Sequence, residues 1–168
     1  FEKLDVPPTL VSFAITMAKS SSIISPEFKK AGSRVVLLQA KIKENGLPDA
    51  ESLNCLLAQV QKLIADGRVL SAYVPGFGGV AEAIMKMCLG NSLGFHYDDS
   101  LTVQDIFGYT IAAFILELAE DMEIGKVLGY TDDSIYFTGC QDRIRLDELR
   151  RVYESRLEDV YPAYTQPA

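Results

Sequence analysis

The sequence predicts a single α+β domain whose sheet is mixed, and three observations support this fold class. The 168 residues are the length of one ordinary domain. Hydrophobic residues make up 48% of the chain and charged residues 23%, which is typical of a folded globular protein. The order of predicted elements, β-β-α-β-α-β-α-β-β-β-α, combines crossover connections with hairpins. We therefore expect α+β layers rather than a doubly wound parallel sheet.

The first predicted elements lie before residue 43. Residues 1–8 end in two prolines, which remove amide donors and fix φ, so they predict a linker into a domain at 9–168. Residues 10–17 are rich in apolar and β-branched side chains and predict a strand. The serine–proline pair that opens residues 25–32 predicts one short helical turn. Residues 34–42 contain four consecutive apolar side chains and predict a strand buried on both faces.

The helix predicted over residues 49–66 has the clearest pattern. Its apolar side chains recur at the i, i+3, i+4 spacing that places them on one face. Asp49 is the expected N-cap, and Gly67 stands where a left-handed residue ends a helix. A strand at 69–74 follows, and after a glycine-rich turn a second amphipathic helix is predicted to end at Gly90.

The last part of the chain predicts shorter elements. A strand is expected at 93–97, and Thr102 with Asp105 indicates the cap of a short helix. Residues 109–118 fit either a helix or a buried strand, and we favour the strand because β-branched side chains recur in it. The remaining predictions are two strands at 126–131 and 134–138 joined by a turn at Asp132-Asp133, and a helix from Asp147 with Leu149, Val152 and Tyr153 facing inward.

Charge and composition exclude several classes of function. The net charge of −7 and the isoelectric point near 4.7 argue against nucleic-acid and anionic-membrane binding, because both need basic patches. The longest apolar run, residues 111–116, is too short to span a membrane, and no signal peptide is evident at the start. Three widely spaced cysteines and a single histidine argue against a disulfide framework and a structural zinc site. These features predict a cytoplasmic protein.

One segment has a pattern with a direct chemical use. Gly76, Phe77, Gly78 and Gly79 lie between a predicted strand and the helix that follows. Glycines let the backbone approach a ligand, and amides at the start of a helix attract anions. The segment therefore predicts a phosphate or nucleotide site built from backbone amides. The alternative is a tight turn required only for packing, because the segment matches neither of the common phosphate-binding glycine motifs.

Other residues with reactive side chains fit structural roles better. His96 has no neighbouring nucleophile or carboxylate in the sequence, which favours a solvated strand end over a general base. The acidic pairs at 98–99 and 132–133 could hold Mg²⁺. Each pair is followed by serine, however, and such sequences are typical of turns and caps. We therefore predict neither a catalytic residue nor a metal ligand.

The three cysteines also predict structural roles. Cys88 falls on the apolar stripe of the second helix and is expected in the core. Cys55 is offset from the stripe of its own helix, and Cys140 follows a glycine in a loop. No histidine is close enough in the sequence to generate a thiolate, so nucleophilic catalysis is not expected.

Several stretches together resemble phosphoribosylformylglycinamidine synthase in its large single-chain form. The resemblance extends from Val6 to about Pro162. Its specificity comes from the order and spacing of the motifs rather than from any one of them. The motifs are VPPTLVSFA (6–14), SPEFKKAG (25–32) leading into VVLL (35–38), GLPD (46–49), GRVLSAY (67–73), GFGGVAEAI (76–84) and GNSLGF (90–95).

The resemblance implies a fold, a reaction and partners. The chain is similar to the C-terminal domain of the second half of the synthase core, an aminoimidazole ribonucleotide synthase-like domain with a three-layer α/β/α sandwich and partial ferredoxin-like topology. The implied enzyme is an ATP-dependent C–N ligase of purine biosynthesis and a glutamine amidotransferase. It activates the amide of formylglycinamide ribonucleotide with ATP and Mg²⁺, and ammonia from glutamine displaces the phosphate to give the amidine. The implied partners are a nucleotide-binding synthase domain and a glutaminase domain of the same polypeptide.

The glycine segment departs from the superfamily pattern in one important respect. Related C-terminal domains commonly carry Asp-x-Ser-x-Gly-Gly at this junction, but here Val74 and Gly76 replace the aspartate and the serine. No carboxylate role is therefore implied at this point, although backbone contacts from Gly78 and Gly79 to a phosphate remain compatible with the sequence. The absence of the aspartate and the serine also fits a half of the synthase that has no catalytic function and keeps a structural role.

Three readings of function follow from the sequence. The first is a ligase domain that contributes backbone amides to a phosphate-bearing ligand, and the second is a purely structural interdomain scaffold. The third is another member of the superfamily, such as a selenophosphate or thiamine-phosphate enzyme. In the first two readings the isolated domain is inactive, holds no cofactor tightly and exposes apolar surface through which it could form a homodimer.

Overall fold

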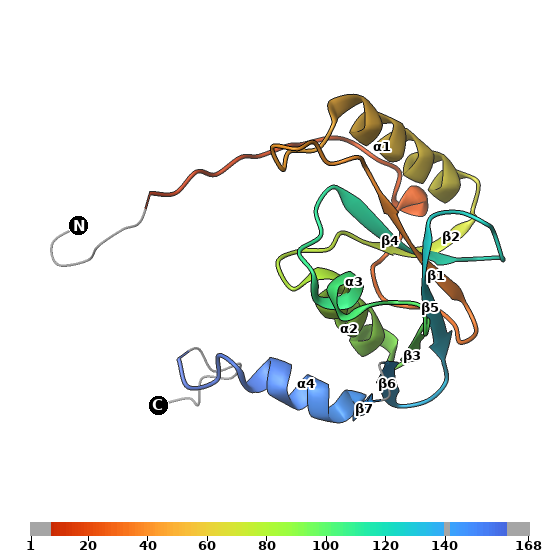
Figure 1. Cartoon of the computed structure of the whole chain (residues 1–168), viewed down its shortest axis with the longest axis vertical. Coiled ribbons are helices and arrows are strands. Elements are labelled where there is room, and N and C mark those ends of the chain that lie inside the picture. Colours follow the sequence, from red (N-terminus) through yellow and green to blue (C-terminus); the bar gives the residue numbers. More distant parts are fainter. Residues whose placement is uncertain (1–7, 140–141, 161–168) are drawn as a thin grey trace, which may run out of the picture.

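A mixed seven-stranded sheet lies between two layers of helices in the computed structural model of the chain (Figure 1). The structure describes residues 8–139 and 142–160, so the predicted linker at 1–8 lies almost entirely outside the described residues. The elements are η1 (Ser20–Ser22), β1 (Arg34–Gln39), α1 (Ala50–Ala65), β2 (Val69–Tyr73), α2 (Gly79–Asn91), β3 (Gly94–Tyr97), α3 (Val103–Phe107), β4 (Ala113–Leu118), β5 (Lys126–Asp132), β6 (Tyr136–Gly139), β7 (Asp142–Arg145) and α4 (Leu146–Ser155).

The strand order is β2-β4-β1-β5-β3-β6-β7. All neighbouring pairs are antiparallel except β3 and β6, which are parallel, so the predicted mixed sheet is confirmed. Strands β1 and β2 run in the same direction on either side of β4, and α1 connects them. This split β-α-β arrangement is the ferredoxin-like part of the topology.

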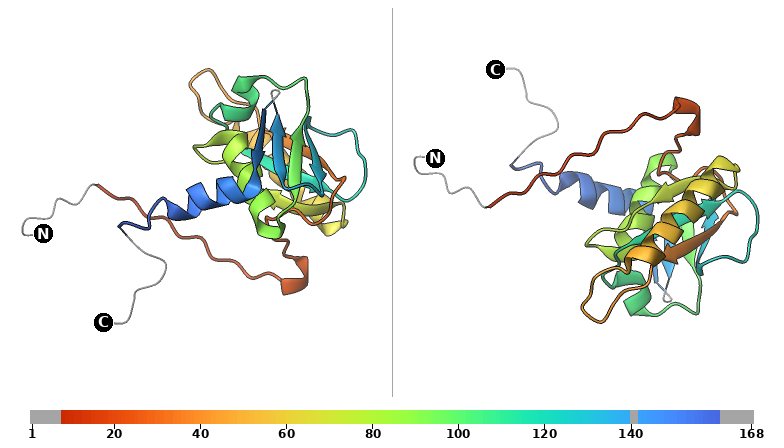
Figure 2. Two further views of the ribbon diagram at one scale, coloured as in Figure 1. Left: turned by 90° about the horizontal axis from the view of Figure 1, so that it is seen from below. Right: turned by 90° about the horizontal axis from the view of Figure 1, so that it is seen from above.

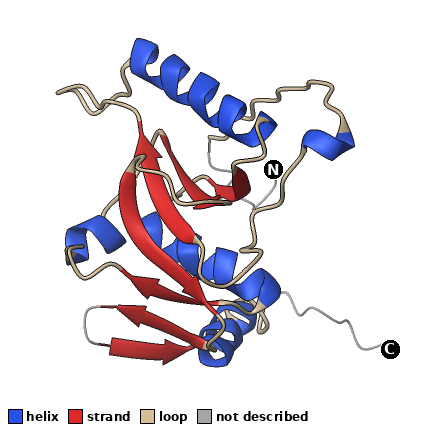
Figure 3. Ribbon diagram, turned by 90° about the vertical axis from the view of Figure 1, so that its right-hand side faces the viewer, coloured by secondary structure: helices blue, strands red, loops and turns tan. Residues whose placement is uncertain are grey.

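Helices cover both faces of the sheet, which confirms the expected three layers (Figure 3). On one face α1 packs on a core that includes Val36, Val60 and Leu116. On the other face α2 and α3 enclose a larger core around Phe28 and Phe95, whose rings stack at a centroid distance of 5.8 Å. Two separate cores follow from a sheet whose central strands are buried on both faces.

Helix α1 forms as the sequence predicts, with local signals at both ends. The Asp49 carboxylate accepts a hydrogen bond of 2.9 Å from the Ser52 amide, which satisfies a free donor of the first turn. Gly67 follows the C-cap with a φ of +69°, and its amide donates to the carbonyl of Ile64. Between these ends the apolar stripe faces the sheet, with Leu56, Val60 and Leu63 buried.

Two predictions near the start of the chain are wrong. Residues 10–17 form no strand within the described chain, because no other segment of the sheet lies beside them. Residues 25–32 form no helical turn, since their amides have tertiary partners instead. The Phe28 amide donates to the Met87 carbonyl at 3.0 Å, and the amides of Lys29 and Lys30 donate to the carboxylate of Glu117.

The second helix also ends differently from the prediction. Gly90 was expected to end it, but α2 continues to Asn91. The left-handed residue that follows is Ser92, with a φ of +56°. The predicted strand at 109–118 begins only at Ala113, and this choice of strand over helix is confirmed.

The C-terminal part differs from the prediction in three respects. Strands β5 and β6 do not form a hairpin around Asp132-Asp133, because β3 lies between them. Residues 142–145 form β7, a strand that the sequence did not predict. Of the three side chains of α4 that were predicted to face inward, Leu149 packs against the core beside Leu146, whereas Val152 and Tyr153 are 59% and 51% exposed. No helix in the described part of the chain is long and apolar enough to cross a membrane.

Candidate functional site

The glycine segment connects β2 to α2 at the end of the sheet that faces α3. Gly76, Phe77 and Gly78 are exposed, whereas Gly79 is buried and has a φ of +64°. A Cβ atom at position 79 would lie 2.5 Å from the carbonyl oxygen of Gly108. Both the backbone conformation and this contact require glycine at position 79. The glycine therefore has a packing function whether or not the segment binds a ligand.

The segment uses two of its four amides internally. The Gly79 amide donates to the Gly76 carbonyl at 3.1 Å, which closes the turn. The Gly78 amide donates to Oε2 of Glu82 at 3.0 Å. The Phe77 amide has no hydrogen-bond partner among the described residues. The four amides that the sequence predicted to converge on a phosphate are therefore not all available to it.

Glu82 occupies the place at the start of α2 where an anion would be stabilised. Its other oxygen, Oε1, accepts a hydrogen bond of 2.5 Å from the Lys86 ammonium one turn later. This hydrogen bond from Lys86, together with that from the Gly78 amide, lowers the pKa of the Glu82 carboxyl. The same pairing raises the pKa of Lys86. A carboxylate in the first turn also interacts favourably with the positive end of the helix dipole.

An exposed aromatic pair borders the segment. The rings of Phe77 and Tyr109 stack with their centroids 5.6 Å apart and their planes at 20°. Phe77 is 90% exposed and Tyr109 is 63% exposed, so most of this apolar surface is open to solvent. A free surface of this kind is suited to contact with another protein or domain.

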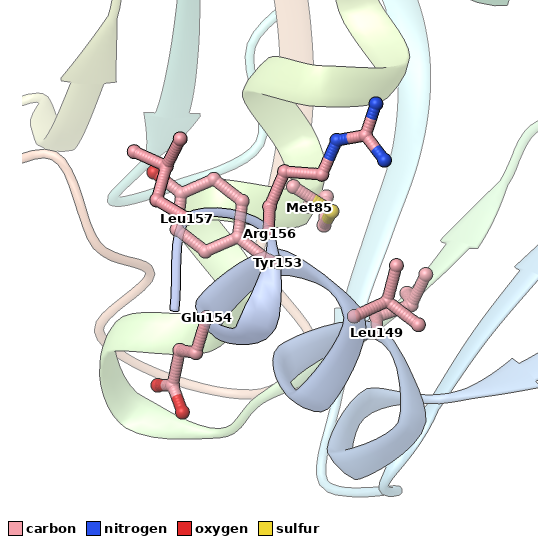
Figure 4. Close-up of a pocket in the computed structure, with 7 residues that line it drawn as sticks. Met85, Leu149, Tyr153, Glu154, Arg156 and Leu157 are labelled. Atoms are coloured by element: carbon pink, nitrogen blue, oxygen red, sulfur yellow. The ribbon is translucent and has the colours of Figure 1, made fainter. Parts of the chain in front are cut away.

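A separate hollow lies between α2 and α4. It has a volume of about 640 Å³ and its walls are mainly the side chains of Met85, Leu149, Tyr153 and Leu157 (Figure 4). The two charged side chains near it do not converge, since Glu154 and Arg156 point in different directions in Figure 4. An apolar groove without converging polar groups can receive apolar side chains but has no means to orient a polar substrate.

The remaining candidates lie apart from the glycine segment and from one another. His96 is exposed on β3. The Asp98 carboxylate accepts hydrogen bonds from the Ser100 hydroxyl and amide, and these bonds lower the pKa of Asp98. Asp132 similarly accepts from the Ser134 amide at 2.7 Å. The described residues contain no group of three or more His, Cys, Asp or Glu side chains placed to hold a metal ion.

The cysteines differ in their surroundings. Cys88 lies on the buried face of α2, in the core as predicted, and burial raises the pKa of its thiol. Cys55 is exposed on α1. Cys140 lies outside the described residues. A thiol that is buried and strongly protonated is a packing group rather than a nucleophile.

The structure contains one buried charged group that the sequence reading missed. Glu117 on β4 is completely buried, and its carboxylate accepts from the Lys29 amide at 2.9 Å and the Lys30 amide at 3.2 Å. The Ser71 hydroxyl donates a third bond at 2.8 Å. The only signal in the sequence was an acidic residue within an otherwise apolar strand, at a position where charge is rarely buried unless it is paired.

Comparison with known proteins gives a consistent result for the fold. No protein-family model matches the chain. The phosphoribosylformylglycinamidine synthase II of Thermotoga maritima matches 90% of this chain with a TM-score of 0.62 and 12% identity. The T. maritima PurL structures complexed with ATP and with FGAR match 79% and 77% of it, with TM-scores of 0.59 and 0.61 and identities of 14% and 11%. This chain has the fold of one part of these synthases.

The match covers most of this chain but a minor part of each synthase. The chain spans only 28% to 30% of the length of these three structures, so more than two thirds of each synthase has no counterpart in it. The α+β sandwich implied by the sequence resemblance is confirmed by the synthase fold. At these levels of identity the likeness concerns the arrangement of the chain and not its chemistry.

Proposed function

We propose that this chain is a C-terminal synthase domain of an ATP-dependent ligase that converts formylglycinamide ribonucleotide and glutamine to the amidine in cytoplasmic purine biosynthesis. The observation that supports this proposal is the fold match to PurL over 77% to 90% of the chain. The ordered motifs between Val6 and Pro162 are a second, independent support. The partners of the domain are then a nucleotide-binding synthase domain and a glutaminase domain of the same polypeptide.

The role that the geometry favours is structural. Glu82 already uses the Gly78 amide, and Gly76 uses the Gly79 amide. Within the described residues no group of three or more His, Cys, Asp or Glu side chains is placed to hold a metal ion. The residues present therefore do not fit a tight ATP·Mg²⁺ site, and we assign ATP, Mg²⁺ and the glutaminase chemistry to the other domains. Exposed apolar surfaces at Phe77–Tyr109 and along α4 are suited to packing against such domains.

A backbone contact to phosphate at Gly76, Phe77, Gly78 and Gly79 is the second candidate role. It is favoured by the exposure of the first three residues and by the Phe77 amide, which has no partner in the described chain. A phosphate could reach the Gly78 amide only by displacing the Glu82 carboxylate. Such a contact would therefore be weak in the isolated domain.

The enzymatic assignment is tested by assays on two polypeptides. The 168-residue chain is expected to form no amidine from formylglycinamide ribonucleotide, ATP, Mg²⁺ and ammonia. The longer polypeptide to which we assign it is expected to form amidine with glutamine as the ammonia source. If that polypeptide were inactive with this substrate but active with selenide or thiamine phosphate, the chain would belong to another branch of the superfamily. Amidine formation by the short chain alone would also contradict the proposal.

The two roles of the domain are separated by a titration with ATP at low ionic strength in the presence of Mg²⁺. The variant Glu82→Ala frees the Gly78 amide and removes a negative charge, so it should bind at least tenfold more tightly than the wild type if the segment contacts phosphate. Glu51→Ala is the matched control, because Glu51 lies in the first turn of α1. Equal and negligible binding by all three proteins would favour the scaffold. Substituting Gly79 is not informative, since any side chain there meets the Gly108 carbonyl.

A further inference from the structure

We propose that residues 9–17 are a β-strand that completes the sheet of a partner domain rather than the sheet of this domain. The inference rests on the proposed function, because the partner is the nucleotide-binding synthase domain of the same polypeptide. It concerns an interaction surface and not the chemistry of the synthase. The sequence predicts a strand here, and no strand of the described sheet pairs with residues 10–17.

The segment has the side-chain pattern of a strand with one buried face. Val11, Phe13, Ile15 and Met17 alternate with small or polar side chains at 12, 14 and 16, as in a strand whose alternate residues point to opposite faces. Phe13, Ile15 and Met17 are 86%, 96% and 99% exposed. A regular row of large apolar side chains in water is unfavourable, and it marks a surface that another protein surface covers.

The backbone of residues 10–18 also has no partner within the described chain. Residues 10–18 make no backbone hydrogen bond to any other part of the described chain. The segment extends away from the body of the domain (Figures 1 and 2), and its first regular contact with it comes at η1, where Ser22 borders a groove on α1. Nine residues in strand conformation span about 30 Å, which is enough to cross a whole sheet edge.

The sheet of this domain has two edge strands, β2 and β7, and residues 10–18 make no backbone hydrogen bond to either of them. The edge strand β7 has the sequence Asp142-Arg143-Ile144-Arg145, with three charged side chains in four residues. Such charges are a common means of preventing an edge strand from pairing with another chain. Residues 9–17 carry no charge at all and lack that protection. The contrast indicates that β7 remains an edge, whereas the apolar segment is paired in the assembled protein.

The partner that fits is the edge of a sheet with one apolar face. Pairing with such an edge would satisfy the amides and carbonyls of the segment and bury its four large side chains together. The solved synthases provide room for this partner, since more than two thirds of each lies outside the part that matches this chain. The segment would then be a strand of one domain that is joined covalently to the next.

Hydrogen exchange on two polypeptides tests the inference. In the 168-residue chain, the amides of residues 10–17 are expected to exchange at nearly the rate of an unfolded peptide. In the longer polypeptide they should exchange at least 100-fold more slowly. Fast exchange in both would overturn the proposal. Protection in the short chain that increases with protein concentration would overturn it in favour of a second copy.

A pair of variants of the longer polypeptide tests whether the apolar face is the buried one. Ile15→Asp should reduce the protection of residues 10–17 at least tenfold, whereas Thr16→Asp, on the opposite face, should preserve it. Equal loss in both variants would contradict one-sided burial. Amidine formation is measured on the same wild-type sample. If residues 10–17 were protected but the polypeptide formed no amidine, the strand proposal would stand and the proposed function would fail. If the polypeptide formed amidine but these residues were not protected, the proposed function would stand and the strand proposal would fail.

Discussion

The Glu117 carboxylate joins a loop near the start of the chain to the middle of the sheet. It accepts two backbone amides from residues 29 and 30 and one hydroxyl from Ser71, and none of it reaches solvent. Buried charges are tolerated when hydrogen bonds of this number compensate them. The same bonds explain why residues 25–32 form a bend and not the predicted helical turn, since their amides have partners outside the segment.

Removing this carboxylate should be costly. Glu117→Ala is expected to lower the free energy of unfolding by about 3 kcal/mol, because it leaves two amides and a hydroxyl without their acceptor in a buried site. Ser71→Ala removes a single donor and should cost about 1 kcal/mol. Urea denaturation of both variants gives the comparison. Equal losses would mean that the amides find another acceptor.

Glu82 should make stability depend on pH in the acidic range. Because its pKa is lowered in the folded chain, the ionised form stabilises the fold above the ordinary glutamate pKa. This stabilisation is lost as the pH falls from about 5 through the lowered value. The free energy of unfolding of Glu82→Gln should therefore decrease less between pH 6 and pH 3 than that of the wild type. Glu51→Gln is the control, and a wild-type-like decrease in Glu82→Gln would contradict the assignment.

Among the elements, β5 depends on a glycine that the neighbouring strand approaches closely. Gly129 has a φ of +147°, and a Cβ atom there would lie 2.0 Å from the carbonyl oxygen of His96 on β3. The register between β1 and β5 also shifts between Val35 and Val36, opposite this residue. The irregularity lets β5 pair with β1 on one side and β3 on the other.

Gly129→Ala is therefore expected to destabilise the fold by more than about 2 kcal/mol. Gly46→Ala is a matched control, because Gly46 has a φ of +80° but no atom within 4 Å of its Cβ position. That variant should lose only about 1 kcal/mol, the usual cost of a left-handed conformation. Thermal and urea unfolding measure both losses. Similar values would show that the close approach of His96 is relieved at no cost.

The elements also show which predictions a sequence can support. Helix α1 was predicted almost to the residue because its cap, its stripe and its final glycine are all local signals. The pattern of residues 10–17 is equally regular, but a strand exists only where a second strand lies beside it. Strand β7 was missed for the opposite reason, since Asp142-Arg143-Ile144-Arg145 has no apolar alternation and forms by pairing with β6.

At the glycine segment the turn was predicted from the sequence, but its hydrogen bonds were not. The glycines do form a tight strand-to-helix turn, and Gly79 does require positive φ. Glu82, which would compete with a phosphate for the Gly78 amide, lies three residues beyond Gly79. An acidic side chain is typical of this position in the first turn of a helix. Its contact with Gly78 depends on the orientation of a flexible side chain, which spacing alone does not determine. The stacking of Phe77 on Tyr109 could not be predicted either, because the two residues are 32 positions apart in the sequence.

At the scale of the whole molecule, burial divides the large apolar side chains into two groups with different effects on stability. Phe28 is completely buried in the larger core, whereas Phe13 is 86% exposed. Phe28→Ala should lower the free energy of unfolding by 3–5 kcal/mol, roughly the range known for buried phenylalanine. The double variant Phe13→Ser/Ile15→Ser should change it by less than about 0.5 kcal/mol. A large loss in the double variant, measured by urea denaturation of the 168-residue chain, would mean that residues 9–17 contribute to folding of this domain.

The attachment of β6 to the rest of the sheet has a consequence for motion. Within the described residues the ladder pairs Phe95–Phe137 and His96–Thr138 connect it to β3, and β7 and α4 follow it at the edge. Side chains therefore hold this terminal hairpin and helix in place: Phe137 packs edge to face on Tyr97, and Leu146 is buried in the larger core. Because two ladder pairs join β6 to β3, the attachment of the last strands depends on side-chain packing more than on backbone hydrogen bonds, and weakening that packing should release this end of the sheet first.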